Sequence, residues 1–155
     1  MEAETDRARA IPMPAVFFGL LVLGFILDWV HPVTLGSNLA FQVAGVTVIV
    51  FGLAIGSSGV IAMKSAHTTL SVGRIPATAL VEKGIFRHTR NPLYLSMLII
   101  FLGIAIFTTV LWLILLLPIL FLIADRGVAR PEESYLKRKF GQVYLQYKKR
   151  VPRWV

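Results

Sequence analysis

Residues 93–124 read LYLSMLIIFLGIAIFTTVLWLILLLPILFLIA, a run of 32 residues without a charged side chain. As one helix this run would be about 48 Å long at about 1.5 Å per residue, whereas the hydrocarbon core of a bilayer is about 30 Å thick. Two shorter helices joined by a tight turn near Phe107, Thr108 and Thr109 fit the bilayer better, because a buried turn can satisfy its own backbone hydrogen bonds. The run therefore predicts a membrane-spanning helical hairpin, with spans at about 92–107 and 109–124 and a kink at Pro118.

Two more apolar stretches precede this hairpin, at about 14–30 and 38–63. The first is just long enough to cross a bilayer, and Trp29 near its end suits the interface. A secretory signal peptide is the alternative interpretation, because basic residues precede the stretch. The acidic residues Glu2, Glu4 and Asp6, and the absence of a small-residue cleavage site, favour a membrane span.

The second stretch is long enough to span the membrane with some tilt. It contains Gly52-Leu-Ala-Ile-Gly56, and glycines at this spacing let another helix approach closely. Helix packing is the expected role of these two glycines. Together with the hairpin, the two stretches predict an all-α polytopic membrane protein with about four transmembrane helices.

The composition of the chain agrees with a membrane protein and excludes several other classes. Of its 155 residues 56% are hydrophobic and 15% are charged, whereas soluble domains average about 45–50% apolar and about 25% charged residues. Disorder is excluded for the same reason. The absence of cysteine rules out disulfides and thiol chemistry. The length predicts a single domain over 1–155.

The formal net charge of +8 is unevenly distributed along the chain. All Lys and Arg residues fall in 1–13, 63–92 and 125–155, and the connections at about 31–37 and 107–109 contain none. Because cytoplasmic loops are enriched in Lys and Arg, this pattern predicts a cytoplasmic N-terminal tail, two cytoplasmic segments and an N-in, C-in topology. The basic charge thus indicates orientation in the membrane. Contact with membrane lipids is expected, and no nucleic-acid partner is expected. The expected location is the inner (cytoplasmic) membrane of a bacterial-type cell.

Motifs of conventional soluble catalysis are missing from the sequence. There is no dinucleotide fingerprint, phosphate-binding loop or nucleophile elbow. The three histidines, His31, His67 and His88, lie far apart and form no paired metal-binding motif, so no metal site is expected.

The first segment of functional interest is 78–94, TALVEKGIFRHTRNPLY, which leads into the third span. Gly84 marks a turn, and Asn91-Pro92 is typical of a helix start, with Asn91 as the N-cap. Helix N-termini attract anions, and Arg87 and Arg90 would add charge-assisted donors for a carboxylate. The alternative is a capped helix whose arginines contact lipid phosphates.

The second such segment is 125–147, DRGVARPEESYLKRKFGQVYLQY. Asp125 and Arg126 are expected to pair with each other at the end of the last span. Pro131 opens a cytoplasmic amphipathic helix whose apolar face holds Leu136, Phe140, Val143, Tyr144 and Tyr147. An interfacial helix that binds anionic lipid is one interpretation. Glu132 and Glu133, the only acids after Asp125, favour a binding role instead.

The two segments together resemble the integral-membrane methyltransferases of the isoprenylcysteine carboxyl methyltransferase and phospholipid methyltransferase group. The resemblance covers about residues 71–154 and lies in Leu80-Val81-x-x-Gly84-x-Phe86-x-x-x-Arg90-Asn91-Pro92-x-Tyr94, followed by Glu132-Glu133-x-x-Leu136-x-x-x-Phe140-Gly141-x-x-Tyr144-x-x-Tyr147-x-x-x-Val151-Pro152. It implies that S-adenosylmethionine binds among membrane helices. The residues that carry over to the cofactor pocket are Thr78, Ala79, Leu80, Val81, Phe86, Arg90, Asn91, Pro92, Leu93, Tyr94, Glu132 and Glu133.

The resemblance also implies methyl transfer to a lipophilic acceptor, which is a prenylcysteine-like carboxylate, a phospholipid amine or a small thiol. The candidate catalytic residues are Arg90 and Arg126, which would position a carboxylate, and Glu132, which would act as the base for an amine or thiol. Asn91 and Phe86 depart from the histidine and tyrosine of the eukaryotic prenylcysteine enzymes, so the prenylcysteine substrate is not transferred. The alternative function is a non-catalytic membrane module whose basic tail binds anionic lipid or a partner.

Overall fold

The computed structural model describes residues 12–33, 36, 38–68 and 78–155. All regular structure in this part of the chain is helical, which confirms the predicted all-α fold. The elements in chain order are α1 (Met13–Val30), α2 (Leu39–Ser65), η1 (Gly84–Arg87), α3 (Pro92–Thr108), α4 (Leu111–Leu122), η2 (Ile123–Ala129) and α5 (Arg130–Arg150). The predicted N-terminal tail as far as residue 11, and residues 69–77 of the predicted 63–92 segment, lie outside the described residues.

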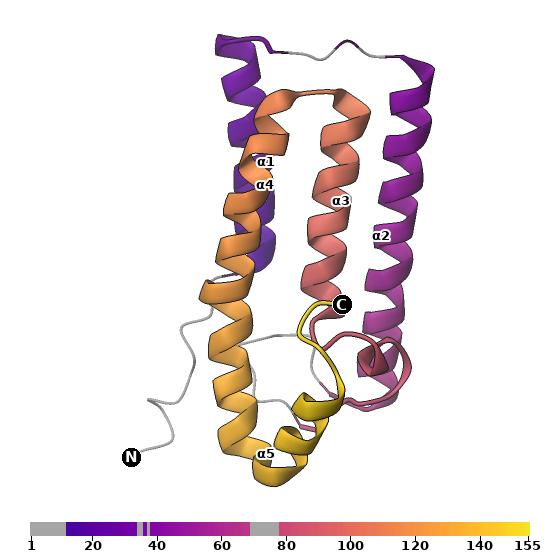
Figure 1. The fold of residues 1–155 in the computed structure, drawn as a ribbon, viewed down its shortest axis with the longest axis vertical. Helices are drawn as coiled ribbons and strands as arrows, with labels where there is room; N and C mark the ends of the chain where they lie inside the picture. Colours follow the sequence, from indigo (N-terminus) through magenta and orange to yellow (C-terminus); the bar gives the residue numbers. More distant parts are fainter. Residues whose placement is uncertain (1–11, 34–35, 37, 69–77) are drawn as a thin grey trace.

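The long helices form an elongated bundle in which α2 packs on α3 and α1 packs mainly on α4 (Figure 1). The predicted hairpin is present, because α3 and α4 run antiparallel and are joined by Thr109, with a left-handed φ of 55°, and Val110. Among the described helices, α1, α2 and the continuous helix Leu111–Arg150 are long and apolar enough to cross a membrane. The apolar α3 is shorter, at 17 residues.

Glycines form the contact surface of α2 with α3. Gly45, Gly52 and Gly59 are the buried residues of α2, and their seven-residue spacing places them on one helix face. A Cβ on Gly52 would lie 2.7 Å from the Ile100 side chain, and one on Gly56 would lie 2.9 Å from the Ser96 hydroxyl. The close helix approach predicted from Gly52 and Gly56 is therefore present, and many of the large hydrophobic side chains elsewhere on α2 are exposed.

Aliphatic and aromatic side chains form the core between α1, α3 and α4. Phe17 of α1 packs edge-on against Phe101 of α3, and Phe101, Leu113 and Leu120 are fully buried. At the end away from α5, the Trp112 indole donates to the His31 carbonyl at 2.9 Å and ties the α3–α4 turn to the end of α1. The helices therefore hold the start of α3 and the end of α4 in fixed relative positions.

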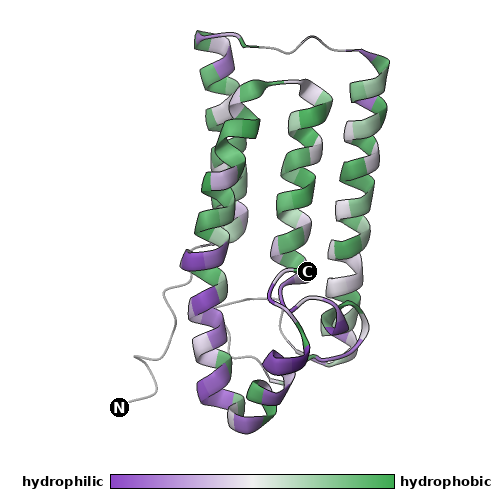
Figure 2. Ribbon diagram, in the orientation of Figure 1, coloured by the Kyte–Doolittle hydropathy of each residue, from purple (hydrophilic) through white to green (hydrophobic). Residues whose placement is uncertain are grey.

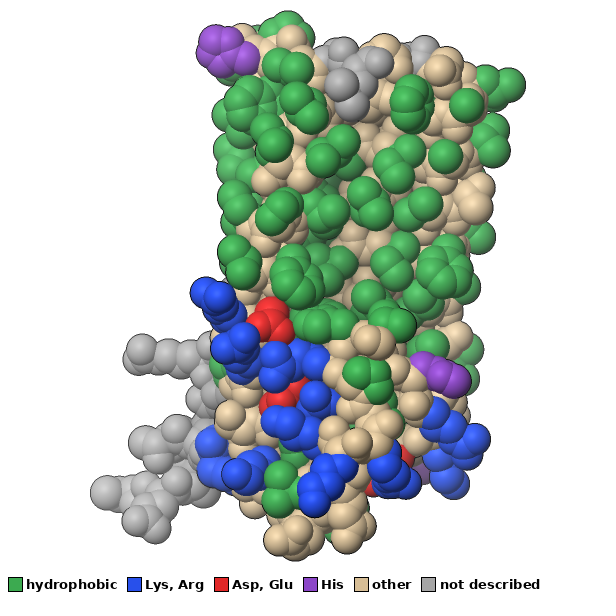
Figure 3. Space-filling view, in the orientation of Figure 1, with side chains coloured by type: hydrophobic (Ala, Val, Ile, Leu, Met, Phe, Trp, Pro, Cys, Tyr) green, Lys and Arg blue, Asp and Glu red, His purple; other side chains and the backbone are tan. Residues whose placement is uncertain are grey.

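Charged side chains gather at one end of the bundle, and hydrophobic side chains cover the visible remainder (Figures 2 and 3). This end contains η1, the N-terminus of α3, η2 and α5. The basic segments that follow α2 and α4 in the sequence thus meet in space. The N-in, C-in topology stays a prediction.

The predicted amphipathic helix is present as α5, but it changes direction at Gly141, where φ is 55° and ψ is −125°. Glycine adopts such a left-handed φ without strain. The chain beyond Gly141 turns back toward the bundle (Figure 1). Tyr144 and Tyr147 are buried as predicted, whereas Val143 is 57% exposed, so its placement on the apolar face is wrong. The change of direction at Gly141 disrupts the helical spacing that placed Val143 there.

Candidate active site

A cluster of ion pairs lies where the start of α3, η2, α5 and the C-terminal residues 151–155 meet. Glu133 of α5 is its centre: Oε1 lies 2.9 Å from Arg90 Nη1 and 2.6 Å from Arg153 Nε, and Oε2 accepts from Arg153 Nη2 at 3.0 Å and Lys148 Nζ at 3.1 Å. The Arg90 and Glu133 side chains are each only 8% exposed. Burial raises the pKa of Glu133, but its hydrogen bonds and the positive charge of Arg90 outweigh burial and hold that pKa below its ordinary value. Glu133 is therefore an ionised carboxylate whose two oxygens both have partners.

Asp125 forms the second half of the cluster. Its Oδ2 accepts from Arg130 Nε at 3.0 Å, and its Oδ1 accepts from Arg153 Nη1 at 2.8 Å and Trp154 Nε1 at 3.2 Å. The expected Asp125–Arg126 pair is wrong. The π-helical turn directs Asp125 inward, where it is buried, and leaves Arg126 exposed.

Glu132 lies beside this cluster in a different environment. Its carboxyl group lies close to the Tyr94 hydroxyl of α3, and its Oε2 is buried without a hydrogen-bond partner in the described structure. Burial raises the pKa of Glu132 to about 7, helped by the negative charge of Glu133 and opposed by the nearby Tyr94 hydroxyl. A buried carboxyl oxygen without a partner is costly, so this atom has the properties of a ligand contact.

A buried donor without a partner lies in the same cluster. Arg90 donates from Nη1 to the Tyr144 hydroxyl at 3.1 Å and pairs with Glu133, but its Nε is buried and unpaired. The site thus offers one free acceptor, on Glu132, and one free donor, on Arg90. A cationic or hydroxyl group would satisfy the first atom, and an anionic group would satisfy the second.

Asn91 occupies the N-cap position of α3 as predicted, followed by Pro92, but its side chain makes no capping bond. The amide instead donates to the Arg153 carbonyl at 3.1 Å, and the Thr89 hydroxyl donates to the same oxygen at 3.1 Å. The C-terminal residues compete for the side chain that would otherwise cap the helix. Pro92 and Leu93 pack near Gly59 of α2 and fix the start of α3 against that helix.

The rest of the predicted cofactor set lies in 78–86. Thr78 donates to the His67 carbonyl at 2.9 Å, and the backbone N–H groups of Thr78 and Ala79 donate to Thr68 Oγ1. Phe86 is buried, and its carbonyl accepts from the Tyr147 hydroxyl at 2.8 Å. Gly84 makes the predicted turn, with a φ of 62°.

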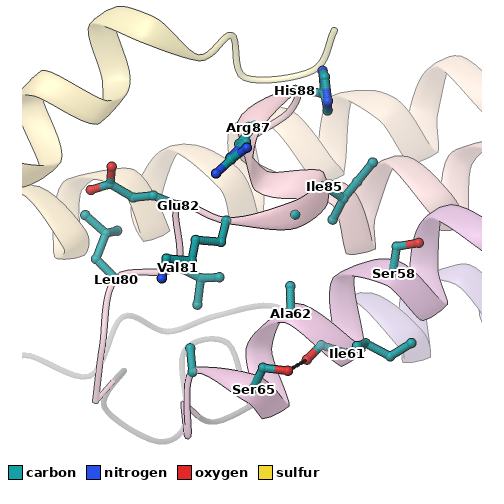
Figure 4. A pocket seen from close by; sticks show the side chains of 13 residues that line it. Ser58, Ile61, Ala62, Ser65, Leu80, Val81, Glu82, Ile85, Arg87 and His88 are labelled. Carbon is teal, nitrogen blue, oxygen red and sulfur yellow. Dashed lines mark hydrogen bonds between the residues drawn. The ribbon is translucent and has the colours of Figure 1, made fainter.

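A groove of about 1130 Å³ separates the last turns of α2 from residues 80–88 (Figure 4). It is lined by the apolar side chains of Ile61, Ala62 and Ile85 and also by Lys83, Arg87 and His88. Leu80 and Val81 line it, but Arg90, Glu132 and Glu133 do not. The predicted residues of segment 78–94 therefore divide between two places: Leu80 and Val81 line the apolar groove, and Arg90 belongs to the polar cluster.

The structure brings together four of the predicted residues, Arg90, Tyr94, Glu132 and Glu133. Arg126 is exposed and makes no ion pair within the described residues. Sequence reasoning missed Arg153, Trp154 and Thr89 as members of the cluster, because they make contacts more than 25 residues away along the chain. The only sequence signal for Arg153 was its position after Val151-Pro152. The described residues contain no group of three side chains suited to hold a metal ion.

Comparison with protein families matches residues 40–143, about two thirds of the chain, to the phospholipid methyltransferase model. The chain belongs to the phospholipid methyltransferase family. The matched region of this family member includes α2, the groove, the start of α3 and both glutamates, and it ends before Tyr144 and Arg153. Comparison with curated proteins and with solved structures gave no match.

Proposed function

We propose that this protein transfers a methyl group from S-adenosylmethionine to a lipophilic acceptor at the cytoplasmic face of the membrane. Family membership supports a membrane methyltransferase, and the buried unpaired atoms of Glu132 and Arg90 support this methyl donor. The amino-acid end of S-adenosylmethionine carries an ammonium and a carboxylate, and its ribose carries two hydroxyls. Glu132 Oε2 suits the ammonium or a ribose hydroxyl, and Arg90 Nε suits the carboxylate.

The two glutamates have different roles in this proposal. Glu133 is occupied by Arg90, Arg153 and Lys148, so it orients Arg90. Glu132 keeps its Oε2 for the ligand, and the Tyr94 hydroxyl lies beside the same carboxyl group. The sequence alone left open which glutamate binds the donor, and the hydrogen bonds favour Glu132.

Bound S-adenosylmethionine supplies a methyl group on an activated sulfonium, so the protein has mainly to align the two reactants and exclude water. Burial of Glu132, Arg90 and Tyr94 provides a dry site for this alignment. If the acceptor is an amine or thiol, Glu132 is the base within the site that takes the proton. If it is a carboxylate, Arg126 is the candidate to position it, because Arg126 is exposed whereas Arg90 is engaged with Glu133.

The experiment that tests the donor is calorimetric titration of S-adenosylmethionine into the purified protein, in detergent and in lipid nanodiscs. Glu132→Gln removes the charge of the free acceptor, and we expect affinity to fall by about 10- to 100-fold, as for the loss of a charged hydrogen bond. Ser134→Ala is the matched control, because this exposed hydroxyl only donates to the Arg130 carbonyl of its own helix. Absence of binding by the unmodified protein at near-millimolar donor in both media would overturn the proposal.

The alternative of a lipid-binding module makes the opposite prediction in the same experiment. Binding to anionic lipid depends on total positive charge and survives Glu132→Gln. A protein that binds anionic vesicles but no S-adenosylmethionine would therefore be such a module.

We assign the lipophilic acceptor to the groove between α2 and residues 80–88. Its apolar lining includes Ile61, which is 63% exposed on α2, one of the helices long and apolar enough to cross a membrane. Ala62→Phe would fill the groove, so we expect transfer of labelled methyl into extracted lipids or small prenyl thiols to fall by about tenfold at saturating donor. Ala54→Phe, on an exposed part of the same helix, is the control. Equal transfer by the two variants would place the acceptor elsewhere.

A further inference from the structure

The last five residues fold back onto the start of α3. Val151 packs with Tyr144 and Tyr147, and the Pro152 carbonyl accepts from the Arg90 N–H at 3.1 Å. The Arg153 carbonyl then accepts from Thr89 and Asn91. These bonds involve the backbone of the C-terminal residues, so they hold the tail in place whatever side chain stands at position 153.

The Arg153 side chain makes contacts of its own, in addition to those of its backbone. Its three guanidinium nitrogens each bind a carboxylate oxygen: Nε and Nη2 bind the two oxygens of Glu133, and Nη1 binds Asp125 at 2.8 Å. The fork–fork contact with Glu133 fixes the plane of that carboxylate. One side chain thus joins α5 to η2 beneath the start of α3.

The position of Glu133 in turn determines the position of the Arg90 guanidinium. Glu133 Oε1 is shared between Arg153 and Arg90, so its position determines where the Arg90 Nη1 group lies. With Nη1 held by Glu133 and Tyr144, the guanidinium plane of Arg90 is set and its Nε–H is left unpaired. Lys148 also contacts Glu133, but it is a point charge on one oxygen and does not define the carboxylate plane.

We propose that Arg153 is a positioning residue for donor binding, acting through Glu133 on Arg90. This inference rests on the proposed function, in which Arg90 Nε binds the donor carboxylate. It concerns a residue outside the matched family region, which ends at residue 143. Because Arg153 acts on the amino-acid end of the donor and not on the reacting methyl group, its loss should weaken donor binding more than it slows transfer at saturating donor.

The test compares Arg153→Gln, Arg153→Lys and the unmodified full-length protein in nanodiscs. We expect Arg153→Gln to raise the donor Kd and KM by about tenfold or more, while kcat at saturating donor stays within about threefold. Arg153→Lys keeps the charge and the backbone contacts but loses the fork, so we expect a Kd about threefold to tenfold above that of the unmodified protein. Lys149→Gln, an exposed neighbour, controls for the loss of one positive charge.

Each result decides between explanations. Unchanged donor affinity in Arg153→Lys, with tenfold loss in Arg153→Gln, would overturn positioning by the fork and indicate that charge alone matters. Equal affinity in all variants would overturn the inference and leave the proposed function standing. Equal losses of kcat and affinity together with a lower Tm in both variants would indicate a merely structural role and overturn it. No donor binding by the unmodified protein would overturn the proposed function and this inference with it.

Discussion

Between α2 and α3 the contacts are made mainly by glycines packed against apolar side chains. At the charged end, Glu133 and Asp125 join the start of α3, η2, α5 and the C-terminal residues through ion pairs. The apolar contact depends on the shape of two adjacent surfaces. The polar contact depends on the direction of individual bonds. The apolar contact can be predicted from the local sequence, whereas the ion-pair contact cannot.

The largest expected effect comes from filling the apolar contact surface. A Cβ on Gly103 would lie 2.9 Å from the backbone nitrogen of Ile49 and 3.0 Å from the Gly45 carbonyl oxygen, and backbone atoms cannot easily move aside. We expect Gly103→Leu to lower the free energy of unfolding by about 3 kcal/mol or more. Thermal unfolding in detergent, followed by circular dichroism, measures this loss.

Gly19→Leu provides the matched control on α1, because a Cβ at Gly19 has no atom within 4 Å. Its Tm should stay close to that of the unmodified protein. If Gly103→Leu unfolded at the same temperature as Gly19→Leu, the α2–α3 contact would be looser than the structure shows.

This difference between regions explains what the sequence could predict. The 32-residue apolar run exceeded the bilayer thickness and so predicted the α3–α4 hairpin, and Gly52 and Gly56 predicted the close helix contact. Both follow from local composition and spacing. The turn at Thr109 was predicted to within a residue for the same reason.

The contacts of the charged end were predicted only in part. The resemblance indicated Arg90, Glu132 and Glu133 as neighbours, but it did not distinguish the paired Glu133 from the unpaired Glu132. Arg153 reaches Asp125 across 28 positions only because α5 reverses at Gly141. A backbone reversal at one glycine, inside a pattern that fits an uninterrupted helix, redirects the chain beyond it.

A change of pH tests the polar region with a smaller and reversible perturbation. The pKa of Glu132 is raised to about 7, and its neighbours are the Tyr94 hydroxyl and the ionised Glu133. A proton on Glu132 competes with a cationic or hydroxyl group of the donor, so affinity should rise with pH up to about 7 and then level off. Below that pH we expect the Kd to increase by about tenfold per pH unit.

Calorimetry between pH 5.5 and 8.5, roughly the range that brackets this pKa, measures the dependence. Glu132→Gln should remove the slope, and Ser134→Ala should keep it. A slope that persisted in Glu132→Gln would assign the titration to another group and remove the support for Glu132 as the donor contact.

The smallest expected effect is that of a substitution at Val143 of α5, which is compared with a substitution at the neighbouring buried Tyr144. Val143 stands between the change of direction at Gly141 and the buried Tyr144, and it is 57% exposed. Because it lies outside both the apolar core and the ion-pair cluster, Val143→Ser should change the free energy of unfolding by less than about 0.5 kcal/mol. Tyr144→Ala, one residue later, removes a side chain that is 1% exposed and that accepts from Arg90, so it should cost about 3 kcal/mol or more. Comparable losses from the two substitutions would mean that α5 continues straight through Gly141 with Val143 on its buried face, and Arg153 would then lie too far from Asp125 and Glu133 to bind both.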